Sequence, residues 1–244
     1  MTVEDDNEIS AAELIGSGKY TYMDFGASTG GSLTFAATAF GGHGFGIDIS
    51  KDKIRNLRKK GLVGVVADAA KIDIPDNSVD YVTMMDFLEH LPNRESGEAV
   101  IDSAVRIARK FVFIVGPNFD SIEYLKDCGF KKFYCDWSGH TWHHSYADML
   151  DIARKHKNCR ACILQLDSFT DSNSSSIHPL TSPRNSGSCD PAKHPPKSFF
   201  RFDRNLHNRI VVLLIKDEAI SPGDIFIRSQ FSSVFYGRDT FRKL

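Results

Sequence analysis

The sequence predicts an α/β protein with a doubly wound, mostly parallel sheet of seven strands and helices on both faces. Three observations support this prediction. Short apolar runs alternate with segments of helical spacing through the first half of the chain. The runs are apolar throughout, as in strands buried on both faces of a parallel sheet. The first run ends at the glycine-rich stretch DFGASTGGS, residues 24–32, and ligands of such sheets bind beyond the carboxyl ends of the strands.

The individual elements begin and end at recognisable signals. Ser50 is a suitable N-cap for one helix, and Gly61 is a typical residue at its C-terminal end. The turn PDNS precedes the fourth strand. The predicted strands are 20–25, 42–49, 63–68, 78–87, 110–117, 160–169 and 209–217, and the predicted helices are 11–16, 32–40, 51–61, 97–109 and 145–156.

The chain of 244 residues is long enough for one large domain, which we place at 20–216. Residues 1–19 are predicted to be a polar lead-in, and residues 217–244 a C-terminal tail. Residues 168–198, between the last two strands, are rich in Ser, Pro and Asn. Because such a composition buries little apolar surface, we expect an exposed, partly disordered or lid-like insertion there.

The composition limits the functional classes. With 41% hydrophobic residues, 25% charged residues and a net charge of −1, the chain is typical of a soluble globular protein without a field that attracts nucleic acid. No apolar run approaches the roughly 20 residues of a membrane helix, and the acidic N-terminus lacks the features of a signal peptide. Five cysteines, an odd number, indicate reduced thiols and a cytoplasmic protein. Cys159 and Cys162 form a CxxC pair without a second pair, so we expect no metal site.

The glycine-rich loop indicates a ligand that lies against the backbone. Gly26, Gly30 and Gly31 follow a strand and precede a helix, so main-chain N–H groups and a helix N-terminus can approach a bound group. Asp48 stands at the end of the next strand, where an acid can accept hydrogen bonds from two ribose hydroxyls. Loop and acid together indicate a nucleoside-containing ligand, the alternative being a capping acid at a strand–helix junction.

Two further motifs specify the ligand. Asp68 follows the third strand, and the stretch MMDFLEHL, residues 84–91, follows the fourth. With these motifs in this order, the chain resembles the class I S-adenosylmethionine (SAM)-dependent methyltransferases of the Rossmann-like superfamily, from about Tyr22 to Pro117 and more loosely to about Lys216. The resemblance implies SAM as the cofactor, methyl transfer as the activity and an antiparallel last strand. NAD is the alternative cofactor, although the loop does not match the GxGxxG spacing of NAD sites cleanly.

The resemblance also implies which residues contact the cofactor. The loop would hold the methionine part, the acid after the second strand the ribose, and the residues after the second and third strands the adenine. Ser28 departs from the family's commonest loop, which has glycine there, and a serine can still donate to the methionine carboxylate. The implied cofactor-binding residues are Asp24, Gly26, Ala27, Ser28, Gly30, Asp48, Ile49, Asp68, Ala69, Asp86 and Phe87, and Glu89 and His90 would face the same pocket or the acceptor.

The acceptor is less well specified. The chain lacks the Asn/Asp-Pro-Pro-aromatic motif of many base N-methyltransferases and the Pro-Cys of enzymes that attack pyrimidines through cysteine. The densest candidate region is DWSGHTWHHS, residues 136–145, after the fifth strand. His140 or His144 there, or His90, can act as a general base near neutral pH. The alternative is that these histidines cap a helix and the tryptophans fill the core.

We therefore expect a SAM-dependent methyltransferase that acts on a small molecule, a glycan or a lipid intermediate, at oxygen or carbon. Two other classes stay open. The enzyme can be an RNA or protein methyltransferase, and a salt-dependent polyanion complex through Arg201, Arg204 and Arg209 would favour RNA. The chain can also be a SAM-binding module without catalysis.

Overall fold

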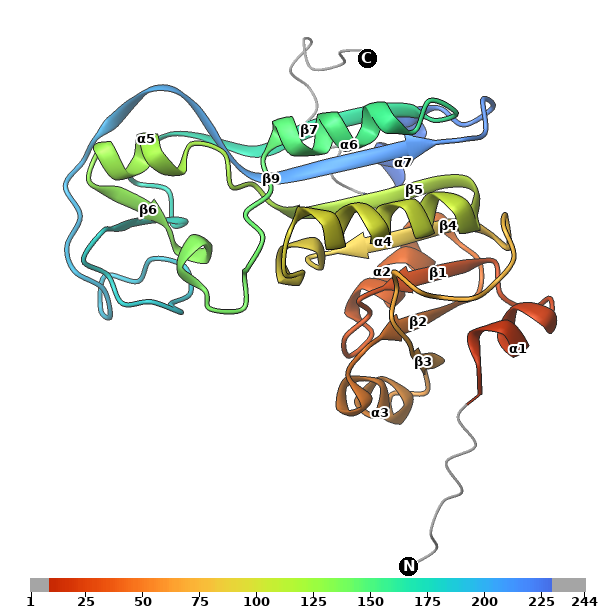
Figure 1. Cartoon of the computed structure of the whole chain (residues 1–244). Helices are drawn as coiled ribbons and strands as arrows, with labels where there is room; N and C mark the ends of the chain where they lie inside the picture. Colours follow the sequence, from red (N-terminus) through yellow and green to blue (C-terminus); the bar gives the residue numbers. More distant parts are fainter. Residues whose placement is uncertain (1–8, 230–244) are drawn as a thin grey trace, which may run out of the picture.

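A computed structural model describes residues 9–229, and its centre is a seven-stranded sheet (Figure 1). The first five strands of the sheet order pair in parallel, whereas β9 pairs antiparallel with β5 and with β7. The predicted mostly parallel sheet and the antiparallel last strand are therefore confirmed. The order is β3 (Gly64–Val66), β2 (Gly44–Asp48), β1 (Tyr22–Phe25), β4 (Val79–Met85), β5 (Ala108–Pro117), β9 (Arg201–Ile215) and β7 (Arg160–Asp171).

Helices cover both faces of this sheet, as the doubly wound prediction requires. Apolar side chains of α1, α4 and α6 pack into one hydrophobic cluster with the strands, and those of α2, α3 and α7 pack into a second cluster. No helix within residues 9–229 is long and apolar enough to cross a membrane. The helices are α1 (Ala11–Gly16), α2 (Gly31–Phe40), α3 (Lys51–Lys59), α4 (Arg94–Ile107), α6 (Tyr146–Lys155) and α7 (Pro222–Arg228).

Two of these helices lie outside the predicted domain limits. Helix α1 belongs to the predicted lead-in, and its Leu14 is buried in the core. Helix α7 belongs to the predicted tail, and its Phe226 is buried against the opposite face. The rest of the predicted tail, residues 230–244, lies outside the described residues.

The long strands β7 and β9 extend past the other strands and carry a small additional unit, which we call the end lobe (Figure 1). It lies beyond the carboxyl ends of the parallel strands and has its own small apolar cluster of Leu125, Phe130, Ile177, Phe202 and Leu206. The end lobe consists of α5 (Ile122–Asp127), β6 (Phe130–Lys132), the 3-10 helix η2 (Phe133–Asp136) and residues 172–200, which include the short strand β8 (Ile177–Pro179).

Residues 180–200 of the Ser- and Pro-rich stretch are mostly exposed and form no helix or strand, in line with the expected exposed insertion. The first part of the stretch is instead packed into the end lobe. It starts within β7, and its short strand β8 pairs antiparallel with β6. Ile177 is fully buried there, because α5, β6 and β9 supply the apolar partners that the stretch itself lacks. The local composition shows only one side of this packing, which is why it did not predict that Ile177 would be buried.

A buried lysine fastens the end lobe to the sheet. The Lys132 ammonium group donates to the carbonyl oxygens of Asn118 and His207, both at 2.7 Å. Burial lowers the pKa of Lys132 to about 8. A third carbonyl, that of Asp120, lies at 3.3 Å, so the buried group is well satisfied by hydrogen bonds.

Candidate functional site

The turn from β1 to α2 depends on glycine at two positions. Gly26 has a φ of +70°, and a Cβ there would lie 2.2 Å from the Phe87 ring. Gly30 has a φ of +92°, and a Cβ there would lie 2.3 Å from Leu62. A side chain at either position would therefore strain the backbone and collide with a neighbour. The loop stays close to the sheet edge and exposes its main chain.

Asp24 supports this loop from behind. The side chain is fully buried, and its carboxylate accepts hydrogen bonds from the hydroxyls of Thr83 at 2.6 Å and of Ser32. Burial raises the pKa of Asp24 to about 7. Ala27 is also fully buried and donates its N–H to the Ile47 carbonyl at 2.9 Å. Asp24, Ala27 and Gly30 therefore shape the loop without lining the cavity in front of it.

That cavity, which we call the loop cavity, lies at the carboxyl ends of β1 to β4 and has a volume of about 250 Å³. Asp48 is its most constrained acid: its carboxylate accepts the N–H groups of Ser28 at 3.1 Å and Ser50 at 2.9 Å. Ile49 beside it is largely exposed, which leaves its side chain free to contact a ligand. Of the predicted cofactor residues, the cavity is lined by Gly26, Ser28, Asp48, Ile49, Asp68, Ala69, Asp86 and Phe87.

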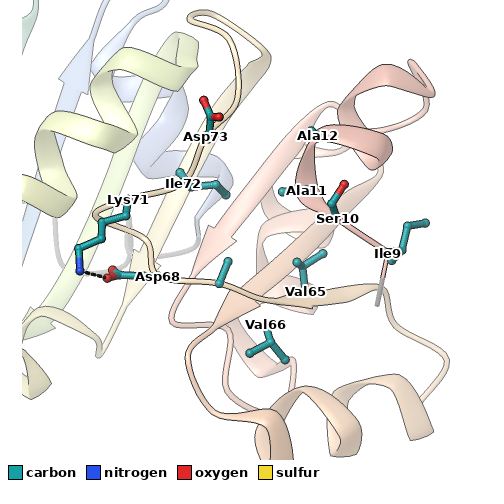
Figure 2. A pocket seen from close by; sticks show the side chains of 11 residues that line it. Ile9, Ser10, Ala11, Ala12, Val65, Val66, Asp68, Lys71, Ile72 and Asp73 are labelled. Atoms are coloured by element: carbon teal, nitrogen blue, oxygen red, sulfur yellow. Dashed lines mark ion pairs between the residues drawn. The ribbon is translucent and has the colours of Figure 1, made fainter. Parts of the chain in front are cut away.

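Asp68 lies at the border between the loop cavity and a second hollow beneath α1. Figure 2 shows this hollow, with Ser10 and Ile9 on one side and the chain after β3 on the other. The carboxylate of Asp68 is turned toward the Lys71 ammonium group, 3.4 Å away, and accepts the N–H of Ala70 at 3.0 Å (Figure 2). This acid is therefore oriented before any ligand binds.

A different cavity adjoins the loop cavity on the side of the end lobe, and we call it the lobe cavity. It has a volume of about 370 Å³ and shares Asp86 and His90 with the loop cavity. Asp86 has a φ of +48° and forms an ion pair with Arg209 of β9 at 2.9 Å. The remaining walls combine aromatic, hydroxyl and amide side chains with a proline and two ionisable groups: Glu89, Pro117, Phe133, Tyr134, Trp137, His140, Ser175, Ser176, Ser188 and Asn208.

The histidine-rich stretch 136–145 packs against the 3-10 helix η1 (Leu88–His90). The N–H groups of Thr141 and Trp142 donate to the Glu89 carbonyl at 2.8 and 3.2 Å. The rings of His90 and His140 consequently lie with their centroids 5.0 Å apart. The LEH segment of the MMDFLEHL motif and the stretch 136–145 thus form one wall of the lobe cavity.

Hydrogen bonds fix the tautomers of both rings. Nδ1 of His90 lies 2.8 Å from the Gly139 carbonyl, and Nδ1 of His140 lies 2.8 Å from the Tyr134 carbonyl. Because a carbonyl only accepts, each Nδ1 must carry the proton, and each Nε2 then offers a lone pair. Burial lowers the pKa of His140, which favours the neutral ring that this tautomer requires.

Glu89 completes a group of potential metal ligands. Its side chain is almost fully buried, its Oε2 atom makes no hydrogen bond among the described residues, and burial raises its pKa to about 8. One carboxylate oxygen of Glu89 and one ring nitrogen each of His90 and His140 lie within 4.8 Å of one another. The Nδ1–H groups bonded to carbonyls are the usual outer partners of metal-binding histidines. The set suits a divalent ion, which the sequence did not indicate because Glu89 and His90 stand far along the chain from His140.

The other aromatic residues of 136–145 have different places. His144 is buried beside Gly116, neither of its ring nitrogens bonds to a described residue, and burial lowers its pKa to about 4. His143 stacks on Phe119 with centroids 4.5 Å apart. Trp137 lines the lobe cavity, whereas Trp142 is buried against Gly97 of α4. Of the three predicted bases, only His90 and His140 therefore reach the cavity.

Several residues of the lobe cavity had no individual signal in the sequence. Tyr134 belongs to η2, and its hydroxyl is bonded to the carbonyl oxygens of Asn118 and Asn208. Ser176 comes from the stretch predicted to be exposed. In this part of the chain, the sequence pointed only to the adjacent stretch 136–145, which includes Trp137.

Comparisons with known proteins agree with this architecture. Residues 23–114 match a family model described as a methyltransferase domain. A SAM-dependent methyltransferase from Archaeoglobus fulgidus is similar in structure over 82% of this chain and 87% of its own, with 18% sequence identity and a TM-score of 0.56. A SAM-dependent methyltransferase from Methanosarcina mazei is similar over 85% of this chain and 99% of its own, with 15% identity and a TM-score of 0.51. A search of curated proteins finds no match.

Proposed function

We propose that the protein is a SAM-dependent methyltransferase, because residues 23–114 match a methyltransferase-domain model and the sheet has the class I topology, and that it methylates a hydroxyl oxygen of a sugar or a similar polyol. The observation that carries this proposal is the position of the lobe cavity, which shares Asp86 and His90 with the loop cavity. An in-line displacement at the SAM methyl group needs its acceptor at such a neighbouring position.

In this proposal SAM binds in the loop cavity. Asp48 receives the ribose hydroxyls, Ile49 covers one face of the adenine, and Asp68 contacts its amino group. The support for these roles is that the Asp48 and Asp68 carboxylates are already oriented by backbone N–H groups. Preformed polar groups of this kind reduce the free energy that binding spends on ordering the site.

The walls of the lobe cavity favour a neutral, hydroxylated acceptor. The rings of Phe133, Tyr134 and Trp137 offer apolar surface, and Ser175 and Asn208 are among the polar groups that can orient hydroxyls. A sugar has both an apolar face and polar edges. The volume of about 370 Å³ lies within the range of roughly 300–1,000 Å³ of small-molecule sites.

The arginines named as a polyanion site support this choice, because two of them are already paired. Arg209 forms its ion pair with Asp86, and Arg204 lies 2.6 Å from Asp203. The guanidinium of Arg204 also stacks on the Tyr124 ring, 4.2 Å from its centroid. Charges compensated in this way attract phosphates less than free ones, which argues against RNA as the acceptor.

A hydroxyl must lose its proton to become a good nucleophile. We assign Glu89, His90 and His140 to a divalent ion, in place of the base role expected for the histidines. Such an ion supplies Lewis-acid chemistry that lowers the pKa of a nearby hydroxyl. The chain contributes the carbonyls of Gly139 and Tyr134, which hold both rings in the tautomer with a free Nε2.

The test is methyl transfer from labelled SAM to a panel of monosaccharides and glycosides. The protein is first treated with a chelator and then supplied with Mg²⁺, Mn²⁺ or Zn²⁺. We expect label on a hydroxyl oxygen of at least one glycoside, and only after an ion is added. Glu89→Gln should remove this activity, whereas Glu95→Gln, at an exposed position of α4, should retain it.

Two outcomes would overturn the proposal. Transfer that continues undiminished after the chelator treatment would remove the ion from the mechanism. Transfer to RNA or to a protein in parallel reactions, with none to the glycosides, would replace the acceptor class. Calorimetric titration with SAM in the same preparations establishes that the cofactor cavity is intact in each variant.

A further inference from the structure

A second group of potential ligands lies in the end lobe, apart from the methyl-transfer site. One ligand atom each of His178, Cys189 and His194 lies within 4.8 Å of the others. The rings of His178 and His194 are close, with centroids 4.3 Å apart. These side chains come from β8 and from a segment after it that has no helix or strand.

His178 is the residue that calls for an explanation. It is fully buried, and neither of its ring nitrogens makes a hydrogen bond to a described residue. Burying polar nitrogens without partners costs free energy, so native proteins nearly always satisfy them. The ring contacts Phe133 only loosely, with centroids 6.1 Å apart, and this packing does not satisfy its nitrogens.

The two partners are chemically suited to the same ion. The half-buried Cys189 offers a sulfur, which as a thiolate is a strong ligand for zinc. Nδ1 of His194 lies 3.1 Å from the Asp190 carbonyl and 2.9 Å from the Asp190 N–H. Because the Asp190 N–H donates to Nδ1, the neutral ring carries its proton on Nε2, and this proton must leave or move to Nδ1 when Nε2 binds a metal.

From this geometry we propose that His178, Cys189 and His194 bind a zinc ion that fixes the end lobe. Imidazole nitrogen and thiolate sulfur are both ligand types that zinc binds, and a water molecule would complete a four-coordinate site. The thiolate also offsets the positive charges nearby. Of these, the Lys131 ammonium group is paired with Asp136, and that of Lys197 is held by the carbonyls of Ser174 and Ile177.

The position of the site gives the ion a consequence for the lobe cavity. The bridge from His178 to His194 closes the segment that contains Ser188, one of the cavity walls. Within the same segment, the Ser186 carbonyl accepts the indole N–H of Trp137 at 2.6 Å, and the Asn185 side chain accepts the N–H of Ser138 at 2.8 Å. Fixing this segment therefore fixes the wall that carries Trp137.

The experiment uses Co²⁺ as a spectroscopic substitute for Zn²⁺ and needs no acceptor. The full-length protein is reduced, stripped with a chelator and titrated with Co²⁺. We expect a sulfur-to-cobalt charge-transfer band in the near ultraviolet, which the Glu89, His90 and His140 set cannot produce because it has no sulfur. Cys189→Ser should lose the band, and Cys128→Ser, at the end of α5, should keep it.

Metal content and thermal stability give the second measurement. Purified wild-type protein should carry Zn²⁺ that Cys189→Ser lacks, with a difference of about one ion per chain. Added Zn²⁺ should raise the Tm of the stripped wild-type protein and not that of Cys189→Ser. His140→Ala should keep both the band and the Zn²⁺-dependent rise in Tm, which separates this site from the one in the proposed function.

Either of two results would overturn the inference. One is the absence of a thiolate band in stripped wild-type protein that still binds SAM. The other is equal zinc content and an equal zinc-dependent Tm shift in the wild type and in Cys189→Ser. In both cases His178 is a buried histidine of the end lobe and nothing more.

Discussion

The loop cavity and the lobe cavity are neighbours, yet they are built differently. The loop cavity comes from four short connections that follow β1 to β4, and its polar groups are held mainly by backbone N–H groups. The lobe cavity is assembled from η1, η2, β9 and residues 175–188, and its walls are side chains. The first construction is local and depends on backbone geometry, whereas the second depends on tertiary packing. Changes in the end lobe should therefore affect the acceptor and spare the cofactor.

The largest expected effect is on catalytic rate, and it distinguishes the role of the lobe cavity from that of the loop cavity. His140→Ala should lower kcat by about 10²–10⁴-fold, because the proposed hydroxyl activation in the lobe cavity is lost. The affinity for SAM should stay unchanged, since His140 does not line the loop cavity. The measurements are steady-state methyl transfer and calorimetric titration with SAM.

His143→Ala is the matched control for that variant. His143 stacks on Phe119 and does not line either cavity, so its kcat should stay close to that of the wild type. Equal losses in the two variants would mean that the stretch 136–145 acts through its packing and not through a ligand at His140.

The next effect tests whether the end lobe is a separate cooperative unit. Ile177→Ala removes a fully buried side chain from the small cluster and should destabilise the lobe by about 2–5 kcal/mol. Amide hydrogen exchange should rise within residues 172–200 and β6, while β1 and β2 keep their protection. Leu180→Ala, at an exposed position, should change neither. Increased exchange throughout the sheet would show that lobe and sheet unfold together.

The same contrast explains how far the sequence could predict the molecule. The alternation of strands and helices follows from the apolar pattern, and the glycine loop and the acids of the loop cavity follow from short motifs at strand ends. His140 could be named as a candidate, but its meeting with Glu89 depends on the hydrogen bonds from Thr141 and Trp142. Ile177 and Ser176 stand in a polar stretch whose packing partners lie elsewhere in the chain. Pairings between distant segments are not encoded in any local period, which is why the lobe cavity was incompletely predicted.

A smaller effect is expected at the cofactor end. Asp48→Ala should weaken SAM binding by about 1.5–3 kcal/mol, the contribution of hydrogen bonds to a charged group. Asp52→Ala is the control, because this acid is exposed and pairs with Arg55 on the same helix. Calorimetric titration measures both. A folded Asp48→Ala protein with wild-type SAM affinity would remove Asp48 from the cofactor site.

The last expected effect concerns the support behind the glycine loop. Burial raises the pKa of Asp24 from 3.8 to about 7, so between these values the folded protein binds a proton that the unfolded chain has released. Stability should therefore fall as pH rises through this window, by at most about 1.4 kcal/mol per pH unit, and level off above it. Asp24→Asn has no such proton, and its free energy of unfolding should fall less between pH 5 and pH 7. Urea unfolding of both proteins at the two pH values measures this difference. If the two slopes agree, Asp24 is charged in the folded protein, and the loop rests on a buried carboxylate that the hydroxyls of Ser32 and Thr83 stabilise.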